Sequence, residues 1–500
     1  MQLLAQEFAA RADRAPGDLA VVDVLGEHTV GEVMEAAREL AAALEQTLGG
    51  SPTVLVQADN TWRTLATALA VGLRGGMVAV FSSHAVAEEF TLAMEDIEPD
   101  AVVASDGTLE HWAASTEAFP DKRSALDGWT LATSGRPATD VARWSGGVAV
   151  AMTSGSTGRP KCVVQSEESL RYAGRCTIDA IGLRPGDAVG AFVPLSSVAA
   201  YCFGMYLPAM LEGPMVCIES WKPDEALEAM ARHDVRWTML VPTMALQLSV
   251  RPSGAGKLAG LRAMTVGGGP MDAGALGRAE QVLGTKFIRV FGMSECLGHT
   301  TTSPAEDAAT RLGSDGRPFP GTEVRAVGEG GNPQPVGEVG AAQVRGPSMF
   351  VGYARHGRPQ PPPLTDDGFL PTGDLVRLNP DGTITILGRE KQIIIRGGRN
   401  IDINEVEAAV ARVPGIAQVC VVPVPDEMLG ERVAALVVSA GPDLSLADVT
   451  GHLDVTGFPK AKWPEFVFAV PDLPQNRVGK LSRPDAVRLA AELAAADGVT

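Results

Sequence analysis

The stretch Met152-Thr-Ser-Gly-Ser-Thr-Gly-Arg-Pro-Lys161 lies between two short apolar runs. Gly147-Val-Ala-Val-Ala-Met152 before it and Cys162-Val-Val-Gln165 after it each predict a buried strand, so we expect the stretch to turn back between two strands. Hydroxyl donors, flexible glycines and a cation are what a polyphosphate requires of a loop. The candidate phosphate ligands are Thr153, Ser154, Gly155, Ser156, Thr157, Gly158 and Lys161.

This loop differs from a Walker P-loop. Lys161 follows Pro160 rather than Gly, and Cys162 stands where Ser or Thr would hold magnesium. No helix N-terminus follows in register to receive a phosphate. For such a loop taken alone, a Ser/Gly-rich surface turn remains the alternative interpretation.

The composition indicates a large acidic globular chain. Its 500 residues are too many for a single hydrophobic core. At roughly one domain per 150 residues, this length indicates two to four structural units. The net charge of −18 argues against nucleic acid or an anionic membrane as a general partner. The six cysteines lack metal-ligand spacing and favour reduced thiols. Without a leader or an apolar run of roughly 20 residues, we expect a soluble cytoplasmic protein with no membrane partner.

Apolar runs alternate with helical stretches over the first 300 residues, which is typical of βαβ units and a parallel sheet. Ligands of open α/β sheets bind beyond the carboxyl ends of such strands. The predicted strands are 19–23, 53–57, 77–81, 101–104, 188–193, 215–218, 237–241, 263–266 and 286–290. After these 300 residues, short apolar runs separated by turn residues predict a β-rich subdomain.

The predicted fold class is therefore α/β. We expect a large N-terminal domain over residues 1–390, built from parallel-sheet α/β subdomains and the β-rich subdomain. A small mobile α+β C-terminal domain is expected over residues 391–500, with a helix from Asn404 and strands near 419–422 and 466–470. The segment 359–363, rich in proline, is expected to be a stiff exposed loop.

The first motif resembles the phosphate-binding signature of the AMP-forming adenylating enzymes, the superfamily of acyl-CoA synthetases, adenylation domains and luciferases. Phe291-Gly-Met-Ser-Glu295 follows a predicted strand and resembles that family's aromatic-Gly-x-Thr-Glu motif. The resemblance implies that Phe291 stacks on adenine, with Gly292 and Met293 beside the nucleotide. It also implies that Ser294 touches the α-phosphate and that Glu295 binds magnesium, which takes carboxylate and phosphate oxygens.

Further matches extend almost to the C-terminus. Gly267-Gly-Gly-Pro270 resembles the family's glycine turn, in which the backbone of Gly268 and Gly269 lies against adenine and the acyl group. Pro371-Thr-Gly-Asp374 matches the carboxylate that accepts the ribose hydroxyls, and Arg389 completes that contact. A structural Asp turn is the alternative for Asp374.

Three matches concern the predicted small domain. Lys391 falls at the family's hinge between domains, and Gly397 and Gly398 match the loop that lines the thiol-acceptor tunnel. Lys480, in Pro474-Gln-Asn-Arg-Val-Gly-Lys480-Leu-Ser-Arg483, matches the lysine that neutralises developing charge as the carboxylate attacks the α-phosphorus. The resemblance thus makes Lys480, Glu295 and Lys161 the catalytic residues.

Departures from the family pattern concern the substrate. Glu167 stands where many members carry His, so we expect a differently gated acyl pocket. The stretch 192–205 has no Asp for a substrate ammonium, which makes an α-amino acid a poor candidate because a buried unpaired ammonium is costly. If the family layout holds, a bulky apolar or aryl acid is favoured by pocket residues Tyr201, Phe203, Met205, Trp237, Met244, Met271 and Leu297.

The resemblance implies an AMP-forming acid:CoA ligase, an acyl-CoA synthetase that uses ATP, Mg²⁺ and CoA. The acid would become an acyl-adenylate and then a CoA thioester. The alternative is adenylation followed by transfer to the phosphopantetheine of a carrier protein, or release of the adenylate to a partner enzyme. A nucleotide-binding protein without turnover is a third hypothesis, and the intact set of Lys161, Glu295, Asp374 and Lys480 argues against it.

Overall fold

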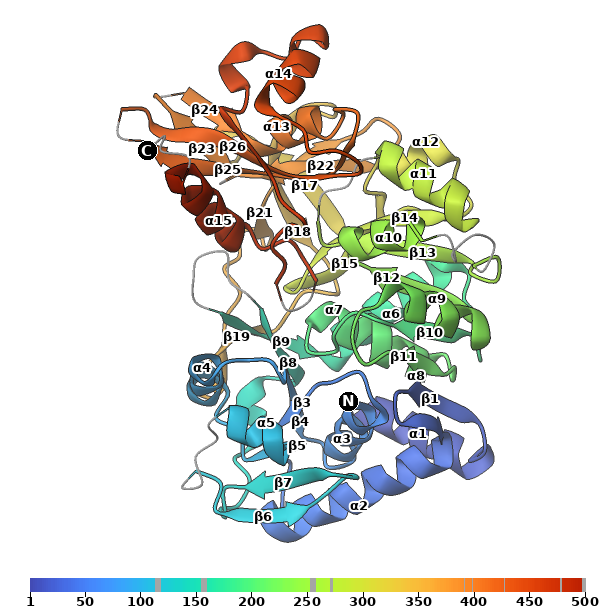
Figure 1. Ribbon diagram of the computed structural model, residues 1–500. Helices are drawn as coiled ribbons and strands as arrows, with labels where there is room; N and C mark the ends of the chain where they lie inside the picture. The colour runs from blue at the N-terminus through green and yellow to red at the C-terminus, as the bar shows by residue number, and fades with distance from the viewer. Residues whose placement is uncertain are drawn as a thin grey trace.

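The structure is a computed structural model of the 500-residue chain. It describes residues 1–112, 118–153, 160–251, 258–269, 273–390, 392–397, 399–426, 428–476 and 479–496, without the side chains of Glu329, Ile393, Ile395 and Asn400. Figure 1 shows a small C-terminal domain, orange and red, at the top and the N-terminal helices, blue, at the bottom.

The first large sheet has a parallel interior and antiparallel edges. In spatial order its nine strands are β16 (Arg317–Pro318), β15 (Cys296–Thr301), β14 (Phe287–Met293), β13 (Ala263–Gly267), β12 (Val235–Leu240), β10 (Ala188–Ala191), β11 (Met215–Cys217), β1 (Leu19–Asp23) and β2 (Gly26–Thr29). Parallel strands place their carboxyl ends at one edge, so the segments after β10, β12 and β13 are neighbours there.

The second large sheet also has nine strands and a parallel centre. In spatial order they are β20 (Arg358–Gln360), β19 (Gly352–Arg355), β9 (Lys161–Ser166), β8 (Gly147–Thr153), β4 (Met77–Phe81), β3 (Thr53–Gln57), β5 (Ala101–Ser105), β7 (Trp129–Thr133) and β6 (Asp121–Ser124). All residues of β3 and β4 are buried, as expected for strands covered on both faces.

Helices separate and cover the two large sheets. Within one continuous hydrophobic core, α3 contacts β1 of the first sheet and β3 of the second, and α6 contacts β15 and β9. The helical segments are α1 (Gln2–Arg14), α2 (Val30–Leu48), α3 (Trp62–Leu73), α4 (Ala87–Ile97), α5 (Asp106–His111), η1 (Val141–Trp144), α6 (Glu167–Ile181), α7 (Val198–Ala200), η2 (Tyr201–Tyr206), α8 (Leu207–Met210), α9 (Pro223–Arg232), α10 (Pro242–Ser249), α11 (Ala273–Leu283) and α12 (Ala308–Gly313).

Two smaller sheets follow. The antiparallel third sheet has the order β17 (Glu323–Val327), β18 (Val339–Arg345), β21 (Leu370–Leu378) and β22 (Ile384–Arg389), with the short η4 (Glu329–Gly331) after β17. The fourth sheet contains β24 (Arg399–Asp402), β23 (Ile393–Arg396), β26 (Gly430–Ser439), β25 (Ile416–Asp426) and β27 (Phe466–Ala469). Its helices are α13 (Ile403–Val410), α14 (Leu446–Val455), η5 (Lys460–Lys462) and α15 (Arg483–Ala496).

The fourth sheet has a separate apolar cluster on each face. Val406 of α13 and Val449 of α14 belong to one cluster, and Ala490 of α15 belongs to the other. The C-terminal sheet therefore has its own core, as a small α+β domain requires. The predicted α/β fold class is confirmed by this architecture and by the structural matches given below.

Local sequence signals explain many element boundaries. A reciprocal capping box between Thr29 and Glu32 begins α2, and Ser166 caps α6, which ends at Gly182 in the left-handed region. The predicted strands at 53–57 and 77–81 have the bounds of β3 and β4. Where the local pattern and the burial agree in this way, sequence alone locates an element.

Two local predictions are wrong. The strand predicted to close at Val290 continues to Met293, because β14 pairs with the unpredicted β15 across the two-residue turn Ser294-Glu295. The proline-rich loop begins inside β20, where Pro359 occupies an edge strand. Proline is tolerated there because an edge strand can do without one backbone donor.

Further observations concern membrane-spanning helices, cysteines and metal ligands. None of the helices in the described parts of the chain is long and apolar enough to cross a membrane. None of the six cysteines forms a disulfide, and the described residues contain no group of three or more His, Cys, Asp or Glu side chains that could hold a metal ion.

Candidate functional site

The predicted phosphate loop lies between two antiparallel strands, as expected from its flanks. Thr153 ends β8 and pairs with Lys161 at the start of β9, and its Oγ1 donates to the Lys161 carbonyl over 3.3 Å. The candidates Ser154, Gly155, Ser156, Thr157 and Gly158 lie outside the described residues.

Tyr353 connects this loop to the predicted magnesium ligand. It lies on β19, which pairs with β9, and its ring centroid is 4.8 Å from Lys161 Nζ. Its hydroxyl donates to Glu295 Oε1 over 2.7 Å. Burial, and then the Glu295 carboxylate, raise the pKa of Tyr353, so the phenol stays protonated and remains a donor. No local motif marks Tyr353, so the sequence alone did not predict its position in the site.

The turn Ser294-Glu295 is held at both residues. Gln165 Nε2 donates to the Ser294 carbonyl over 2.6 Å, and Tyr353 holds the Glu295 carboxylate. Glu295 retains only 9% exposure. A single oriented carboxylate beside a phosphate loop suits magnesium, which completes its coordination with phosphate oxygens and water. The residues present therefore fit a magnesium ion held together with a polyphosphate.

Asp374 has one oxygen paired and one free of protein partners. Its Oδ1 lies 2.7 Å from Arg389 Nε, and its Oδ2 is buried without a hydrogen-bond partner in the described structure. Burial raises the pKa of Asp374 and the Arg389 guanidinium opposes that shift. Buried polar atoms normally have partners, so Oδ2 is suited to accept from a ligand hydroxyl.

The setting of Asp374 differs from the turn considered as an alternative. Asp374 lies inside β21 and is the Cα partner of Arg389 on β22. Gly373 before it has φ +75°, a conformation that favours glycine. The strand pairing thus sets the relative position of the acid and the guanidinium.

Lys480 reaches from the C-terminal part of the chain to the end of β13. A Cβ atom on Gly268, which has φ +81°, would lie only 2.7 Å from Lys480 Nζ. Burial, and then the nearby Arg389, lower the pKa of Lys480. Lys480, Arg389 and Asp374 therefore form one group of charges beside the glycine turn, in which Gly269 lies against Pro242.

Phe291, the predicted adenine platform, is half-buried on β14. His299 packs against it edge-on, with ring centroids 4.5 Å apart and an interplanar angle of 77°. His299 is fully buried, its Nδ1 lies 3.0 Å from the Cys296 carbonyl, and burial lowers its pKa to about 4. The ring is therefore neutral at pH 7. The sequence analysis missed it because nothing local distinguishes it from an ordinary strand residue.

Of the seven candidate acyl-pocket residues, the six that the structure describes are all buried, and they have different surroundings. Phe203 lines a cavity at the ends of β10 and β12. The Trp237 Nε1–H donates to Thr265 Oγ1 over 2.8 Å, and Met244 lies beside Gly479. Tyr201 and Leu297 are core residues at 1% exposure. Met205 is also buried, and Met271 lies outside the described residues.

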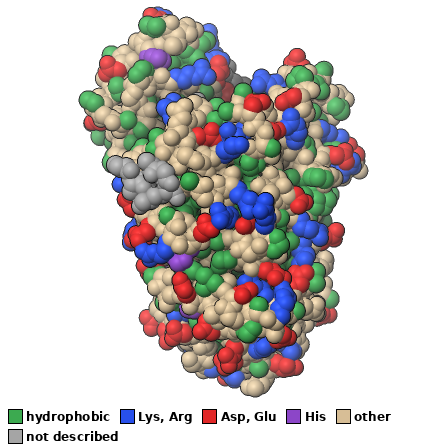
Figure 2. Space-filling view, turned by 90° about the vertical axis from the view of Figure 1, so that its right-hand side faces the viewer, with side chains coloured by type: hydrophobic (Ala, Val, Ile, Leu, Met, Phe, Trp, Pro, Cys, Tyr) green, Lys and Arg blue, Asp and Glu red, His purple; other side chains and the backbone are tan. Residues whose placement is uncertain are grey.

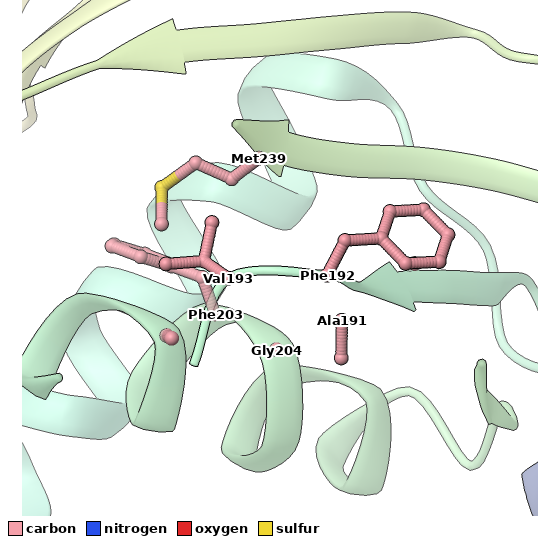
Figure 3. A pocket seen from close by; sticks show the side chains of 8 residues that line it. Ala191, Phe192, Val193, Phe203, Gly204 and Met239 are labelled. Atoms are coloured by element: carbon pink, nitrogen blue, oxygen red, sulfur yellow. The ribbon is translucent and has the colours of Figure 1, made fainter. Parts of the chain in front are cut away.

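The cavity beside Phe203 has an apolar wall and room for about one water molecule. Its lining residues are Gly190, Ala191, Phe192, Val193, Ala200, Phe203, Gly204 and Met239. Figure 3 shows Val193, Phe203 and Met239 approaching one another while the Phe192 ring points away. Met239 lies two residues before Val241, and Val241 lies beside Gly479 in the turn that carries Lys480.

Backbone carbonyls around this cavity are already hydrogen-bonded. Thr238 Oγ1 donates to the Gly190 carbonyl over 2.8 Å. Asn60 Nδ2 donates to the carbonyls of Ala191, over 2.8 Å, and Val193, over 3.2 Å. None of the described side chains that line the cavity carries a hydroxyl, an amide or a charge.

The remaining predictions concern the hinge, the thiol tunnel and Glu167. Lys391 and Gly398 lie outside the described residues, and Gly397, at φ +55°, lies between β23 and β24. Glu167 accepts hydrogen bonds from the Leu3 and Leu4 backbone and from the Tyr206 hydroxyl. That carboxylate is engaged in holding α1 to α6.

Figure 2 shows acidic and basic side chains interspersed on one face, with a group of Lys and Arg side chains near its middle. An acidic chain can bind an anionic ligand through such local groups of cations.

Lys480, with Arg389 and Asp374 near it, places charged groups beside the glycine turn that follows β13, at the carboxyl edge of the first sheet where open α/β proteins bind ligands. Comparison with known families agrees. The family described as AMP-binding enzyme matches residues 8–354, and the AMP-binding enzyme C-terminal domain matches residues 405–480. The chain therefore belongs to the AMP-binding enzyme family, and the resemblance inferred from its motifs is confirmed.

Individual relatives cover almost the whole chain. A salicylyl-CoA synthase / salicylate adenylyltransferase from a Streptomyces species is 32% identical in an alignment of 497 positions that covers 93% of this chain and 89% of that protein. A salicyl-AMP ligase / salicyl-S-ArCP synthetase from Mycobacterium tuberculosis is 29% identical in an alignment of 517 positions, which covers 95% of this chain and 89% of that protein.

Solved structures show the same architecture. The crystal structure of ATP-bound MatB from Rhodopseudomonas palustris matches with a TM-score of 0.81 at 25% identity, covering 98% of this chain and 99% of that one. The chain is thus a member of a family of acid-adenylating ligases that bind ATP.

Proposed function

We propose that the chain is an AMP-forming acid:CoA ligase. It joins a bulky apolar or aryl carboxylic acid to AMP with release of pyrophosphate, and then transfers the acyl group to the CoA thiol with release of AMP. The observation that carries this proposal is the position of Lys480, which brings a cation from the C-terminal domain to the glycine turn after β13, next to Arg389. Preorganised positive charge at this point stabilises charge that develops on the α-phosphate.

The geometry supports the nucleotide roles that the family resemblance implies. Asp374 Oδ2 accepts from the ribose, Arg389 orients the carboxylate, and Phe291 provides the face for adenine. Thr153, Lys161 and the loop between them hold the phosphates, and Lys161 lies against the Tyr353 ring. The tyrosine ring restricts the ammonium of Lys161 without neutralising it.

Magnesium, when bound, neutralises phosphate charge. Glu295 is the residue that would hold it, and Tyr353 would keep the Glu295 carboxylate in position. A carboxylate that a hydrogen bond already orients loses less conformational entropy when it binds a metal ion than a carboxylate that rotates freely.

The chain is proposed to divide into a large domain over residues 1–390 and a mobile domain over residues 391–500, with Lys391 as the hinge. The separate core of the C-terminal sheet supports this division. Gly397 and Gly398 then present the pantetheine thiol in the second step, because glycine permits a close backbone approach. Proline at position 391 should impair thioester formation more than adenylation, since it restricts φ.

The apolar wall of the cavity supports an acid whose far end carries no hydrogen-bonding group. A hydroxyl against that wall would lose its water partners and meet no polar side chain, because none of the described lining side chains carries a hydroxyl, an amide or a charge. Met239 is a flexible side chain that can repack around a larger acyl group. The site thus favours an acyl group whose far end is apolar.

The acceptor can be a carrier protein instead of CoA, as the name of the Mycobacterium tuberculosis relative indicates for that protein. The test begins with ATP–pyrophosphate exchange over a panel of carboxylic acids. Active acids are then offered with CoA or with a holo carrier protein, and thioester is measured. Absence of exchange with every acid would overturn the proposed adenylation, and thioester formed only on the carrier protein would overturn the choice of CoA.

A further inference from the structure

Thr243 joins the large domain to the turn that carries Lys480. It lies in the first turn of α10, directly after Pro242, and its Oγ1 donates to the Gly479 carbonyl over 2.9 Å. The two residues are 236 positions apart in the chain. Their contact is made only when the C-terminal turn lies against α10.

Hydrogen bonds connect the residues of this turn that the structure describes, Asn476, Gly479 and Lys480. The Asn476 N–H donates to the Lys480 carbonyl over 2.7 Å, and the Gly479 N–H donates to the Asn476 carbonyl over 2.9 Å. The Lys480 N–H donates to Asn476 Oδ1 over 3.0 Å. The Gly479 carbonyl belongs to the peptide bond that leads into Lys480, so a group that binds this carbonyl also positions the lysine.

The surroundings of Gly479 are closely packed as well. Its φ is +74°, and a Cβ atom there would lie 3.7 Å from Met244 Sδ and 3.8 Å from Val241 Cγ2. Thr243 and Met244 are consecutive residues of α10. One helical turn therefore supplies both the hydroxyl and the apolar surface on which the C-terminal turn rests.

We propose that Thr243 is a positioning residue that holds the Lys480 turn in the arrangement for adenylation. This inference rests on the proposed function. A contact present in only one of two domain arrangements stabilises that arrangement by its own free energy. The Thr243 hydroxyl therefore favours the first half-reaction and contributes nothing to thiol attack, for which the turn must leave α10.

The test compares Thr243→Val with the wild-type protein in single-turnover measurements of each half-reaction. Valine keeps the branched shape and removes the hydroxyl. We expect adenylation to slow about two- to tenfold, the effect of one neutral hydrogen bond. Thioester formation from a preformed acyl-adenylate should be unchanged or faster, and Thr243→Ser should restore adenylation.

Ser249→Ala is the matched control on the same helix, because the Ser249 hydroxyl bonds the Leu246 carbonyl within α10. It should leave both half-reactions unchanged. Equal loss of both half-reactions in Thr243→Val, or no loss of adenylation, would overturn the inference. Wild-type protein that adenylates no acid would instead overturn the proposed function, so the two failures are distinguishable.

Discussion

Replacing Gly268 by alanine tests the position of Lys480 without touching the lysine. Gly268 has φ +81°, and its added Cβ would lie 2.7 Å from Nζ and 2.8 Å from Cε of Lys480. Carbon atoms cannot remain at such distances, so the ammonium must leave its place beside the glycine turn. The main chain at 268 must also tolerate a left-handed conformation that alanine disfavours.

The two effects have different magnitudes. The left-handed conformation costs about 1–2 kcal/mol of folding stability for an alanine. Displacing the lysine removes a preorganised charge from the reaction, and losing one such donor typically slows a reaction about 10²- to 10³-fold. We therefore expect adenylation by Gly268→Ala to fall at least about 10²-fold in a protein that remains folded.

Gly284→Ala supplies the matched control. Gly284 has φ +70°, and a Cβ atom there meets nothing within 4 Å, so this variant has the backbone strain without the collision. Single-turnover pyrophosphate release and thioester formation from a preformed acyl-adenylate are measured in both variants, together with their thermal unfolding. Gly268→Ala should lose adenylation selectively, and Gly284→Ala should keep both half-reactions.

Similar adenylation rates in the two alanine variants would refute the reasoning, because the collision with Lys480 would then have no chemical consequence. Equal loss of both half-reactions in Gly268→Ala would assign the glycine to the general integrity of the site.

Four other predictions concern the nucleotide, pH and the acid. Asp374→Ala should weaken ATP binding, measured by calorimetry, by about 1.5–3 kcal/mol per lost charged hydrogen bond in a folded protein, and unchanged affinity would remove Asp374 from the ribose site. Because burial lowers the pKa of Lys480, kcat/KM for adenylation should fall at a lower alkaline pH than an ordinary lysine would set, and Lys480→Arg should move that limb upward. Because burial lowers the pKa of His299 to about 4 in the folded protein, the free energy of unfolding should fall by about 3 kcal/mol as pH falls from 6.5 to 4. Urea unfolding of His299→Phe should show a smaller fall over the same pH range. In pyrophosphate exchange, 4-methylbenzoate should exceed the similarly sized 4-hydroxybenzoate by about 10- to 100-fold in kcat/KM, and equal values would contradict the apolar wall.

The sequence by itself was sufficient for features that depend on neighbouring residues. The apolar runs around Met152 and Cys162 determine the two strands that hold the phosphate loop, because buried strands need such runs. Glycine and capping residues mark helix ends for the same local reason, as Thr29 does for α2. The family motifs also lie in continuous short segments, and for that reason they could be recognised without coordinates.

Only the tertiary structure decided which distant residues meet. Tyr353 contacts Glu295 from 58 positions away, and Thr243 contacts Gly479 from 236 positions away, through strand pairing and domain docking that no local pattern encodes. The apolar wall of the cavity illustrates the same limit, since Met239 lines the cavity while the equally apolar Leu297 is packed in the core. Apolar residue types are used alike for cores and for ligand pockets, so their assignment depends on the packing of whole sheets and helices.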